Sequence, residues 1–175
     1  MAKINYQNLK TKKDWCALWV ATFLGSGLIP IAPGTAGTIA AIPLVYSIKD
    51  LNFLTQSLLW ILIAIVGTLA AAEICKNQKS TDHQAIVIDE VTGFWLTMDA
   101  FLFFDISMTP LHWFVGFLLF RVLDVLKLPP VNWVDRWSKK QSRPLYCGLG
   151  VMLDDWIAGV QGFFIIFLLL KFGFL

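Results

Sequence analysis

Acidic side chains stand at the ends of apolar runs in three places of this sequence. Asp89 and Glu90 begin one apolar segment, Asp124 ends another, and Asp154 with Asp155 begins a third. Ionised carboxylates beside hydrocarbon cost free energy, so a chain that keeps them there commonly uses them. Mg²⁺ binds such oxygens, taking one or two carboxylates and completing its shell with water and substrate phosphate. These five carboxylates are therefore candidate catalytic groups and metal ligands.

Basic side chains and a helix start accompany the acids. Arg121 and Asp124 are three residues apart and share a helix face, and Lys127 follows three residues later. After a Gly/Pro loop, Gly34 and Thr35 place backbone N–H groups at the positive end of the next expected helix. Phosphate is the anion that suits cations, Mg²⁺ and a helix N-terminus together. The candidate phosphate ligands are therefore Arg121, Lys127, Gly34 and Thr35.

Weaker candidates and structural alternatives stand beside these. Ser26, within a Gly-Ser-Gly stretch, is a further candidate for phosphate binding, and His83 is a candidate catalytic base by position. A loop histidine is more often a plain polar residue, and acids at helix starts are also favoured by the helix dipole. Arg121 and Asp124 could form a purely structural ion pair. Asp99 lies within an apolar run, apart from the three acidic clusters.

The elements that carry these residues are expected to be helices in a membrane. The chain is 57% hydrophobic and only 15% charged, against about 25% charged in soluble domains. Period-2 strand patterns do not stand out. We expect an all-α, polytopic membrane bundle with four to five membrane helices and a short N-terminal interfacial helix over 15–24. The expected segments are 35–48, 53–75, 86–104, 111–127 and 150–172, with a long polar loop over 132–149.

The distribution of basic residues orients this bundle. With a cytoplasmic N-terminus, 12 of the 14 Lys and Arg residues fall on the cytoplasmic side, as the positive-inside rule requires. The same topology brings all three acidic clusters to the cytoplasmic face. We expect a single domain over 1–175, with residues 1–14 as a flexible basic N-terminus. The net charge of +2 gives no reason to expect nucleic acid as a partner.

Several motifs resemble, in order, those of the phosphatidylglycerophosphatase A family. The matching stretches are Gly25-Ser26-Gly27 through Thr35, Asp82-His83 through Gly93, Phe120 through Lys127, Asp135-Arg136, and Gly148 through Gly159. One departure is Lys127-Leu128-Pro129-Pro130-Val131, where the family has Lys-Pro-x-Pro-Ile. The resemblance implies Mg²⁺-dependent hydrolysis of phosphatidylglycerophosphate to phosphatidylglycerol and phosphate. It also implies a bacterial inner-membrane enzyme of phospholipid biosynthesis, with its site facing the cytoplasm.

A cation transporter or channel is the alternative from another functional class. Its carboxylates would be distributed through the depth of the membrane, whereas only Asp99 lies deep within an expected span. Other phosphatase types lack their motifs, because the sequence has neither Pro-Ser-Gly-His nor Asp-x-Asp. We expect in-line attack on phosphorus at a metal-assisted site. The number of metal ions and the oligomeric state are left open.

Overall fold

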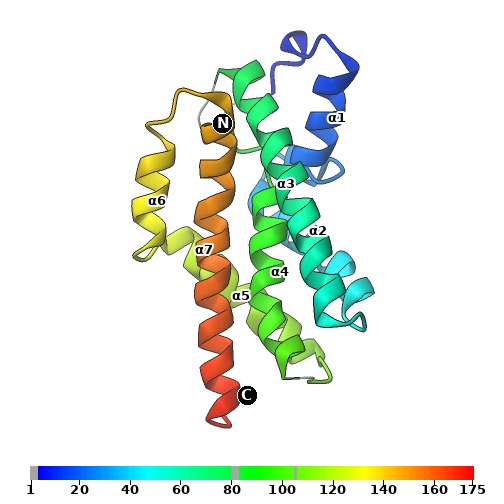
Figure 1. Cartoon of the computed structure of the whole chain (residues 1–175), viewed down its shortest axis with the longest axis vertical. Coiled ribbons are helices and arrows are strands. Elements are labelled where there is room, and N and C mark those ends of the chain that lie inside the picture. Colours follow the sequence, from blue (N-terminus) through cyan, green and yellow to red (C-terminus); the bar gives the residue numbers. More distant parts are fainter. Residues whose placement is uncertain (1–3, 80–82, 105) are drawn as a thin grey trace.

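The computed structural model describes residues 4–79, 83–104 and 106–175, and within them every regular element is helical. Two short 3₁₀ turns accompany seven α-helices (Figure 1). The elements are η1 (Tyr6–Asn8), α1 (Lys12–Ala21), η2 (Ser26–Leu28), α2 (Pro33–Ile48), α3 (Phe53–Gln78), α4 (Ile88–Phe103), α5 (Pro110–Leu126), α6 (Val131–Ser138) and α7 (Pro144–Lys171). The all-α prediction is confirmed. Asp82 lies outside the described residues.

Helices α3 and α7 are the long elements of the bundle, with 26 and 28 residues. At a rise of about 1.5 Å per residue they measure roughly 39 and 42 Å, and both are long and apolar enough to cross a membrane. Helices α2, α4 and α5 have 16 or 17 residues each. Two candidate spans are therefore found among the described residues, where the sequence predicted four to five.

The region after Lys127 differs most from the expected boundaries. Residues 132–149 were predicted as one polar loop, but they hold most of α6 and the first residues of α7. Pro144 stands at the first position of α7, where its missing N–H costs nothing. Asp154 consequently lies ten residues inside α7 rather than at its start. A helix that began at residue 150, as expected, would have placed Asp154 near its start, where the helix dipole favours an acid. In the observed helix Asp154 is too far from the N-terminus for this effect.

The described part of the N-terminal segment packs against the end of α3. Ile4 and Leu9 are buried, and the Asn8 side chain donates to the carbonyl of Asn77. Thr11 and Asp14 form a capping box that starts α1. The observed 3₁₀ turn and cap thus join the basic N-terminal segment to the bundle.

Helices α4 and α7 form the closest seam of the bundle, and small residues make it possible. A Cβ on Gly159 would lie 2.3 Å from the Gly93 carbonyl oxygen, and one on Gly93 would lie 2.6 Å from the Asp155 carbonyl oxygen. Gly162 meets Thr97 in the same way, at 2.6 Å from its hydroxyl. Such contacts allow two helix backbones to approach closely. The seam therefore places the start of α4 directly against the middle of α7.

Candidate active site

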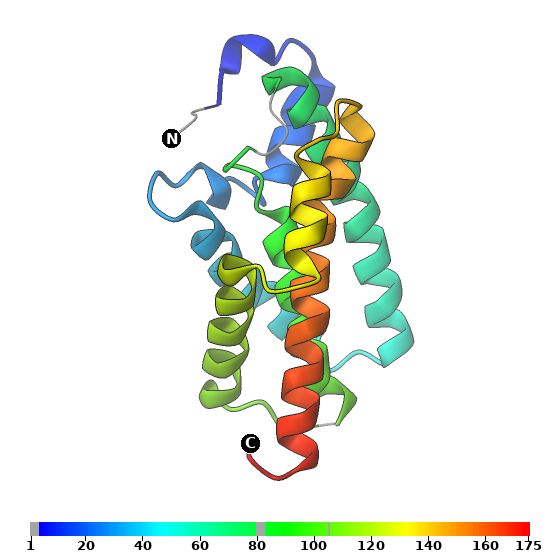
Figure 2. The same ribbon diagram turned by 90° about the vertical axis from the view of Figure 1, so that its left-hand side faces the viewer.

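The predicted acidic residues converge on one cavity of about 340 Å³. Its walls come from the start of α2, the start of α4, the end of α5, the inner face of α6 and the middle of α7. Figures 1 and 2 show these helices from two directions. All five predicted carboxylates line it, namely Asp89, Glu90, Asp124, Asp154 and Asp155. The sequence-based prediction that three separate segments meet is thus confirmed.

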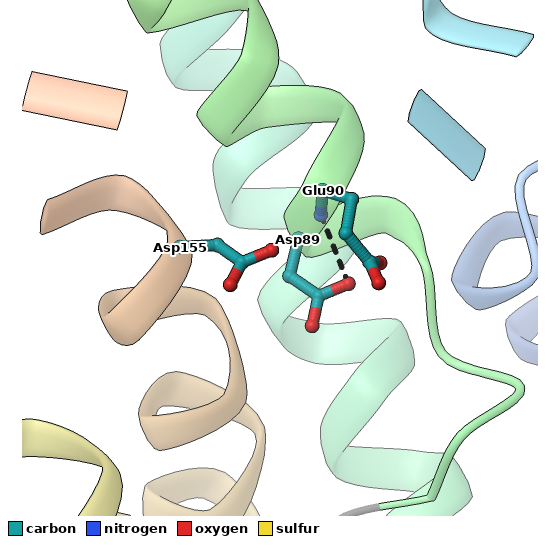
Figure 3. A group of neighbouring side chains, drawn as sticks. All are labelled: Asp89, Glu90 and Asp155. Atoms are coloured by element: carbon teal, nitrogen blue, oxygen red, sulfur yellow. Dashed lines mark hydrogen bonds between the residues drawn. The ribbon is translucent and has the colours of Figure 1, made fainter. Parts of the chain in front are cut away.

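Three of the five carboxylates form a cluster suited to a cation. One ligand oxygen each from Asp89, Glu90 and Asp155 lies within 4.8 Å of the others. In Figure 3, the side chain of Asp155 extends from α7 toward Asp89 and Glu90 on α4. Oxygen atoms Oε2 of Glu90 and Oδ2 of Asp155 are buried and have no hydrogen-bond partner. Such acceptors normally require a partner, and this donor set fits a hard divalent cation.

The helix start orients two of these acids. Asp89 and Glu90 occupy the first turn of α4, and Oδ1 of Asp89 accepts the backbone N–H of Glu90 at 3.0 Å (Figure 3). Negative charge is favoured at this end of a helix. Three carboxylates so close together nevertheless repel one another strongly at low dielectric. The dipole explains their position, and a bound cation would explain their mutual proximity.

Asp124 has a basic partner of its own. The Arg121 Nη1 atom lies 2.8 Å from Oδ2 of Asp124 and 3.8 Å from Oε1 of Glu90. Arg121 also donates to the Thr38 hydroxyl at 3.4 Å. The predicted pairing of Arg121 with Asp124 is therefore present, and it connects the end of α5 to both α2 and α4. Arg121 lines the cavity, where a guanidinium can bind phosphate oxygens.

Lys127 bridges α6 and α7 through two carboxylates. Its ammonium donates to Asp154 Oδ2 at 2.6 Å and to Asp135 Oδ1 at 2.5 Å. Burial disfavours the charge of Lys127, but Asp154 and Asp135 outweigh this effect and hold its pKa above the ordinary value. Lys127 lines the cavity as predicted. A phosphate bound by Lys127 would share the ammonium group with these two carboxylates.

Asp135 is a cavity residue that sequence reasoning did not assign to the site. Burial would raise its pKa, but hydrogen bonds from Lys127 and Lys139 outweigh burial and hold the pKa below the ordinary value. Asp135 is therefore ionised at neutral pH. Its signal in the sequence was the spacing of Val131, Asp135 and Ser138, which places them on one face of a helix. Gln84 and Ser138 also line the cavity and were not predicted.

The start of α2 supplies backbone donors to the same cavity. Pro33 stands at the first helical position, two residues before the expected start at 35, and Gly34 and Thr35 line the cavity behind it. Ala32 precedes them with a φ of 50° and provides no side-chain cap. The first N–H groups of a helix have no intrahelical partner, so they can bind an anion. A Cβ on Gly34 would lie 2.1 Å from Oε1 of Glu90, so only glycine lets α2 approach the acidic cluster.

Two predicted candidates lie elsewhere. The Ser26 hydroxyl donates to the carbonyls of Thr22 and Phe23, within its own turn, and Ser26 is not a lining residue. His83 is buried, and its Nδ1 atom accepts the backbone N–H of Ala85 at 3.3 Å. His83 is likewise not a lining residue. Its Nδ1 atom takes part in the turn that leads into α4.

A hydrogen-bonded group behind the cavity holds three helices in register. Indole Nε1 of Trp156 donates to the Thr92 hydroxyl at 2.8 Å, and that of Trp60 donates to the Thr92 carbonyl at 3.0 Å. The two indole rings pack with centroids 5.3 Å apart. Thr92 follows Asp89 by three residues, and Trp156 follows Asp155 directly. These contacts therefore fix the positions from which the two carboxylates extend.

Comparison with known proteins identifies the family of the chain. The family model described as Phosphatidylglycerophosphatase A matches residues 19–170, which contain every residue of the cavity. The chain belongs to the phosphatidylglycerophosphatase A family. Phosphatidylglycerophosphatase A of Escherichia coli (strain K12) is 37% identical over 153 residues, which cover 87% of this chain and 81% of that protein. Phosphatidylglycerophosphatase A of Haemophilus influenzae is 31% identical over 159 residues, or 85% of each chain.

One further relative is named for a different head group. A Bacteroides thetaiotaomicron protein with the provisional name phosphatidylinositol-3-phosphatase is 32% identical over 154 residues, covering 84% of this chain and 89% of its own length. The names share a phosphate monoester on a lipid head group. No solved structure matches the chain.

Proposed function

We propose that this protein is a Mg²⁺-dependent lipid phosphatase that converts phosphatidylglycerophosphate to phosphatidylglycerol and phosphate. It acts in phospholipid biosynthesis, at the cytoplasmic face of a bacterial inner membrane that it crosses more than once. The observation that carries the proposal is the junction of the Asp89, Glu90 and Asp155 cluster with Arg121 and the start of α2 in one cavity. Membership of the family and the names of its relatives supply the substrate.

The two halves of the cavity divide the work on a phosphate monoester. Asp89, Glu90 and Asp155 would hold Mg²⁺, which neutralises charge on the phosphoryl oxygens when bound. Arg121 and the N–H groups of Gly34 and Thr35 orient those oxygens from the other side. Asp124 keeps Arg121 directed toward the cavity.

The reaction itself is a balanced hydrolysis. A water oxygen forms a bond to phosphorus while the bond from phosphorus to the glyceryl oxygen breaks in line with it. One proton of the water ends on the glyceryl oxygen, which leaves as the new hydroxyl of phosphatidylglycerol. The protein's contribution is position and charge, because this transition state demands little covalent chemistry from side chains.

The transporter alternative receives no support from the placement of the acids. The carboxylates lie in one cavity rather than along a path, and Asp99 is not a lining residue. A channel would require polar groups through the full depth of the bundle. The phosphatase proposal is therefore the one we develop.

Phosphate release from purified protein in detergent tests the proposal. We expect release from phosphatidylglycerophosphate with Mg²⁺ and almost none after chelation. Phosphatidic acid and phosphatidylinositol-3-phosphate, assayed in parallel, define head-group preference. The proposal fails if no phosphomonoester lipid is hydrolysed, and Mg²⁺ is the wrong cofactor if chelation leaves the rate unchanged.

Asp124→Asn is the sharpest single substitution. The change keeps the size of the side chain but removes the charge that pairs with Arg121 at 2.8 Å. We expect phosphate release to fall by about 100-fold or more, as when one preorganised group at a reacting centre is lost. Asp50→Asn is the matched control, because Asp50 is an exposed acid outside the cavity. A near wild-type rate for Asp124→Asn would refute the site assignment.

A further inference from the structure

Helix α6 has two faces of opposite character. Val131, Asp135 and Ser138 are buried on its inner face, and the latter two line the cavity. On its outer face Trp133 and Trp137 are 62% and 41% exposed. Their spacing of four residues places both indoles on the same side of the helix. One helix therefore joins the wall of the candidate active site to an exposed aromatic surface.

Exposed basic residues stand beside these tryptophans along the chain. Arg136, Lys139, Lys140 and Arg143 are exposed on α6 and on the segment that follows it. Asp135 is the one acid of α6, and it faces inward, held by Lys127 and Lys139. Tryptophan rings with neighbouring cations are typical of the boundary between hydrocarbon and head groups. Anionic lipid head groups are the partner whose charge complements this surface.

An exposed apolar stripe precedes the two tryptophans along the chain. Along α5, Phe114, Leu118, Val122 and Val125 are exposed at helical spacing, and exposed Leu128 follows in the turn before α6. In Figure 2, α5 lies at the lower left, and α6 lies above it at the centre of the view, in front of α7. An exposed apolar stripe on a helix of a membrane-embedded bundle contacts lipid. Trp133 and Trp137 stand where this stripe gives way to basic residues.

We propose that α6 lies at the surface of the anionic membrane leaflet, with Trp133 and Trp137 in the head-group boundary and the basic residues on lipid phosphates. Its inner face then holds Asp135 and Ser138 of the cavity at the depth of a lipid head group. The surface recognises the membrane around the substrate. The effect of this membrane contact on catalysis rests on the proposed function.

A depth measurement tests the membrane contact without any reference to catalysis. Trp133→Cys, Trp137→Cys and Lys140→Cys are each prepared in a Cys16→Ser background, because Cys16 is the exposed cysteine of the described chain. The proteins are labelled with a nitroxide and placed in vesicles that contain phosphatidylglycerol. We expect labels at 133 and 137 to collide preferentially with oxygen, and the label at 140 with a water-soluble nickel chelate. Preferential collision with nickel at 133 and 137 would overturn the proposal, as would labels shielded from both reagents, which would indicate a protein partner.

A kinetic comparison tests the consequence for catalysis. The double variant Trp133→Ser with Trp137→Ser should raise KM for phosphatidylglycerophosphate in anionic vesicles by about tenfold. The same variant should match wild-type kcat and KM on a short-chain, water-soluble analogue in detergent. Phe174→Ser, at an exposed aromatic residue just beyond the C-terminal end of α7, is the control. Equal losses on both substrates would mean that the tryptophans shape the site itself, and the proposal would fail.

Charge is tested by Arg136→Gln with Lys140→Gln. Each cation near an anionic surface contributes up to about fivefold in binding, so the double variant should raise KM several-fold in anionic vesicles and not in neutral ones. An equal KM in both kinds of vesicle overturns the charge contribution. If wild-type protein hydrolyses neither substrate, the proposed function fails, while the nitroxide measurement still decides where α6 lies.

Discussion

At the scale of single residues, the cavity contains two kinds of carboxylate. Asp124 and Asp154 each contact a basic side chain, Arg121 and Lys127 respectively. Asp89, Glu90 and Asp155 gather around one point instead. A buried charge needs an opposite charge or a metal ion, so the second group accounts for the cation requirement that we propose. The first group holds Arg121 and Lys127 in the wall of the cavity, where basic side chains can bind the oxygens of a phosphate.

Gly34→Ala tests how closely α2 must approach this cluster. A new Cβ would come 2.1 Å from Oε1 of Glu90 and 3.1 Å from Arg121 Nη2, so the carboxylate and the helix start must separate. We expect phosphate release to fall by at least tenfold, because displacements of about 1 Å at a reacting centre have large effects. Thermal unfolding should change little.

The control for this substitution is Gly116→Ala. Its Cβ would be equally close to a neighbour, 2.3 Å from Sδ of Met98, but methionine is flexible and Gly116 is not a lining residue. Activity should survive in this variant. Wild-type activity in Gly34→Ala would show that α2 takes no part in binding the substrate.

At the scale of elements, the contacts around Thr92 connect packing to catalysis. Trp156→Phe keeps an aromatic ring beside Trp60 but removes the donor to the Thr92 hydroxyl. The free energy of unfolding should fall by about 1 kcal/mol, a typical net value for one hydrogen bond. Because Asp155 precedes Trp156, kcat should fall several-fold and more Mg²⁺ should be needed for half-maximal rate.

Thermal unfolding and Mg²⁺ titrations of activity measure these two effects. Trp19→Phe, at an exposed indole of α1, is the matched control and should alter neither. A Trp156→Phe protein that loses stability with unchanged Mg²⁺ dependence would limit the contacts of Thr92 to folding.

The capping box at the start of α1 makes the stability of the fold depend on pH in the acidic range. The backbone N–H of Thr11 and the side chain of Asn77 donate to Asp14, and these bonds hold its pKa at about 2, below the ordinary value of 3.8. A carboxylate with a lowered folded-state pKa stabilises the fold above its unfolded pKa and loses this effect as pH falls. The melting temperature should therefore decline between about pH 4 and pH 2. Asp14→Asn should melt lower at pH 5 and show a weaker decline, and identical profiles would contradict this account.

At the scale of the whole molecule, the proposed orientation has a direct chemical test. Cys16 is exposed on α1, on the side that the basic residues assign to the cytoplasm. A membrane-impermeant maleimide should label Cys16 in inside-out vesicles and leave it unlabelled in right-side-out vesicles. A Ser47→Cys, Cys16→Ser protein, with its cysteine at the end of α2, should give the reverse pattern. Labelling of both cysteines from one side would refute the proposed topology.

The sequence was sufficient for the convergence of the acids because topology alone determines which helix ends share a face. Asp89 and Asp124 stand at helix ends and follow that rule, whereas Asp154 reaches the same cavity from within α7. It was not sufficient for α6, because Pro129, Pro130 and a run of polar residues are also typical of a loop. Only the packing of Val131 and Asp135 against the bundle shows a helix there.

Side-chain direction was the second gap between sequence and structure. Ser26 and His83 lie in segments that adjoin the site, but the Ser26 hydroxyl and the Nδ1 atom of His83 bond to nearby backbone. An amino-acid sequence specifies where a residue stands along the chain, but not the direction in which its side chain points. The same reason explains why the partners of Lys127 became visible only in three dimensions.

The glycine seam between α4 and α7 has a consequence for genetic experiments. Gly93 and Gly159 meet backbone atoms across the seam at 2.6 and 2.3 Å from any added Cβ, so even alanine would force the helices apart. In a library of point mutants selected for growth, these glycines should be as intolerant as Asp89 or Asp155. Protein abundance would separate the two classes, because glycine variants would be degraded whereas acidic-site variants would accumulate as inactive protein. A scan scored by growth alone would therefore assign the seam to the catalytic centre.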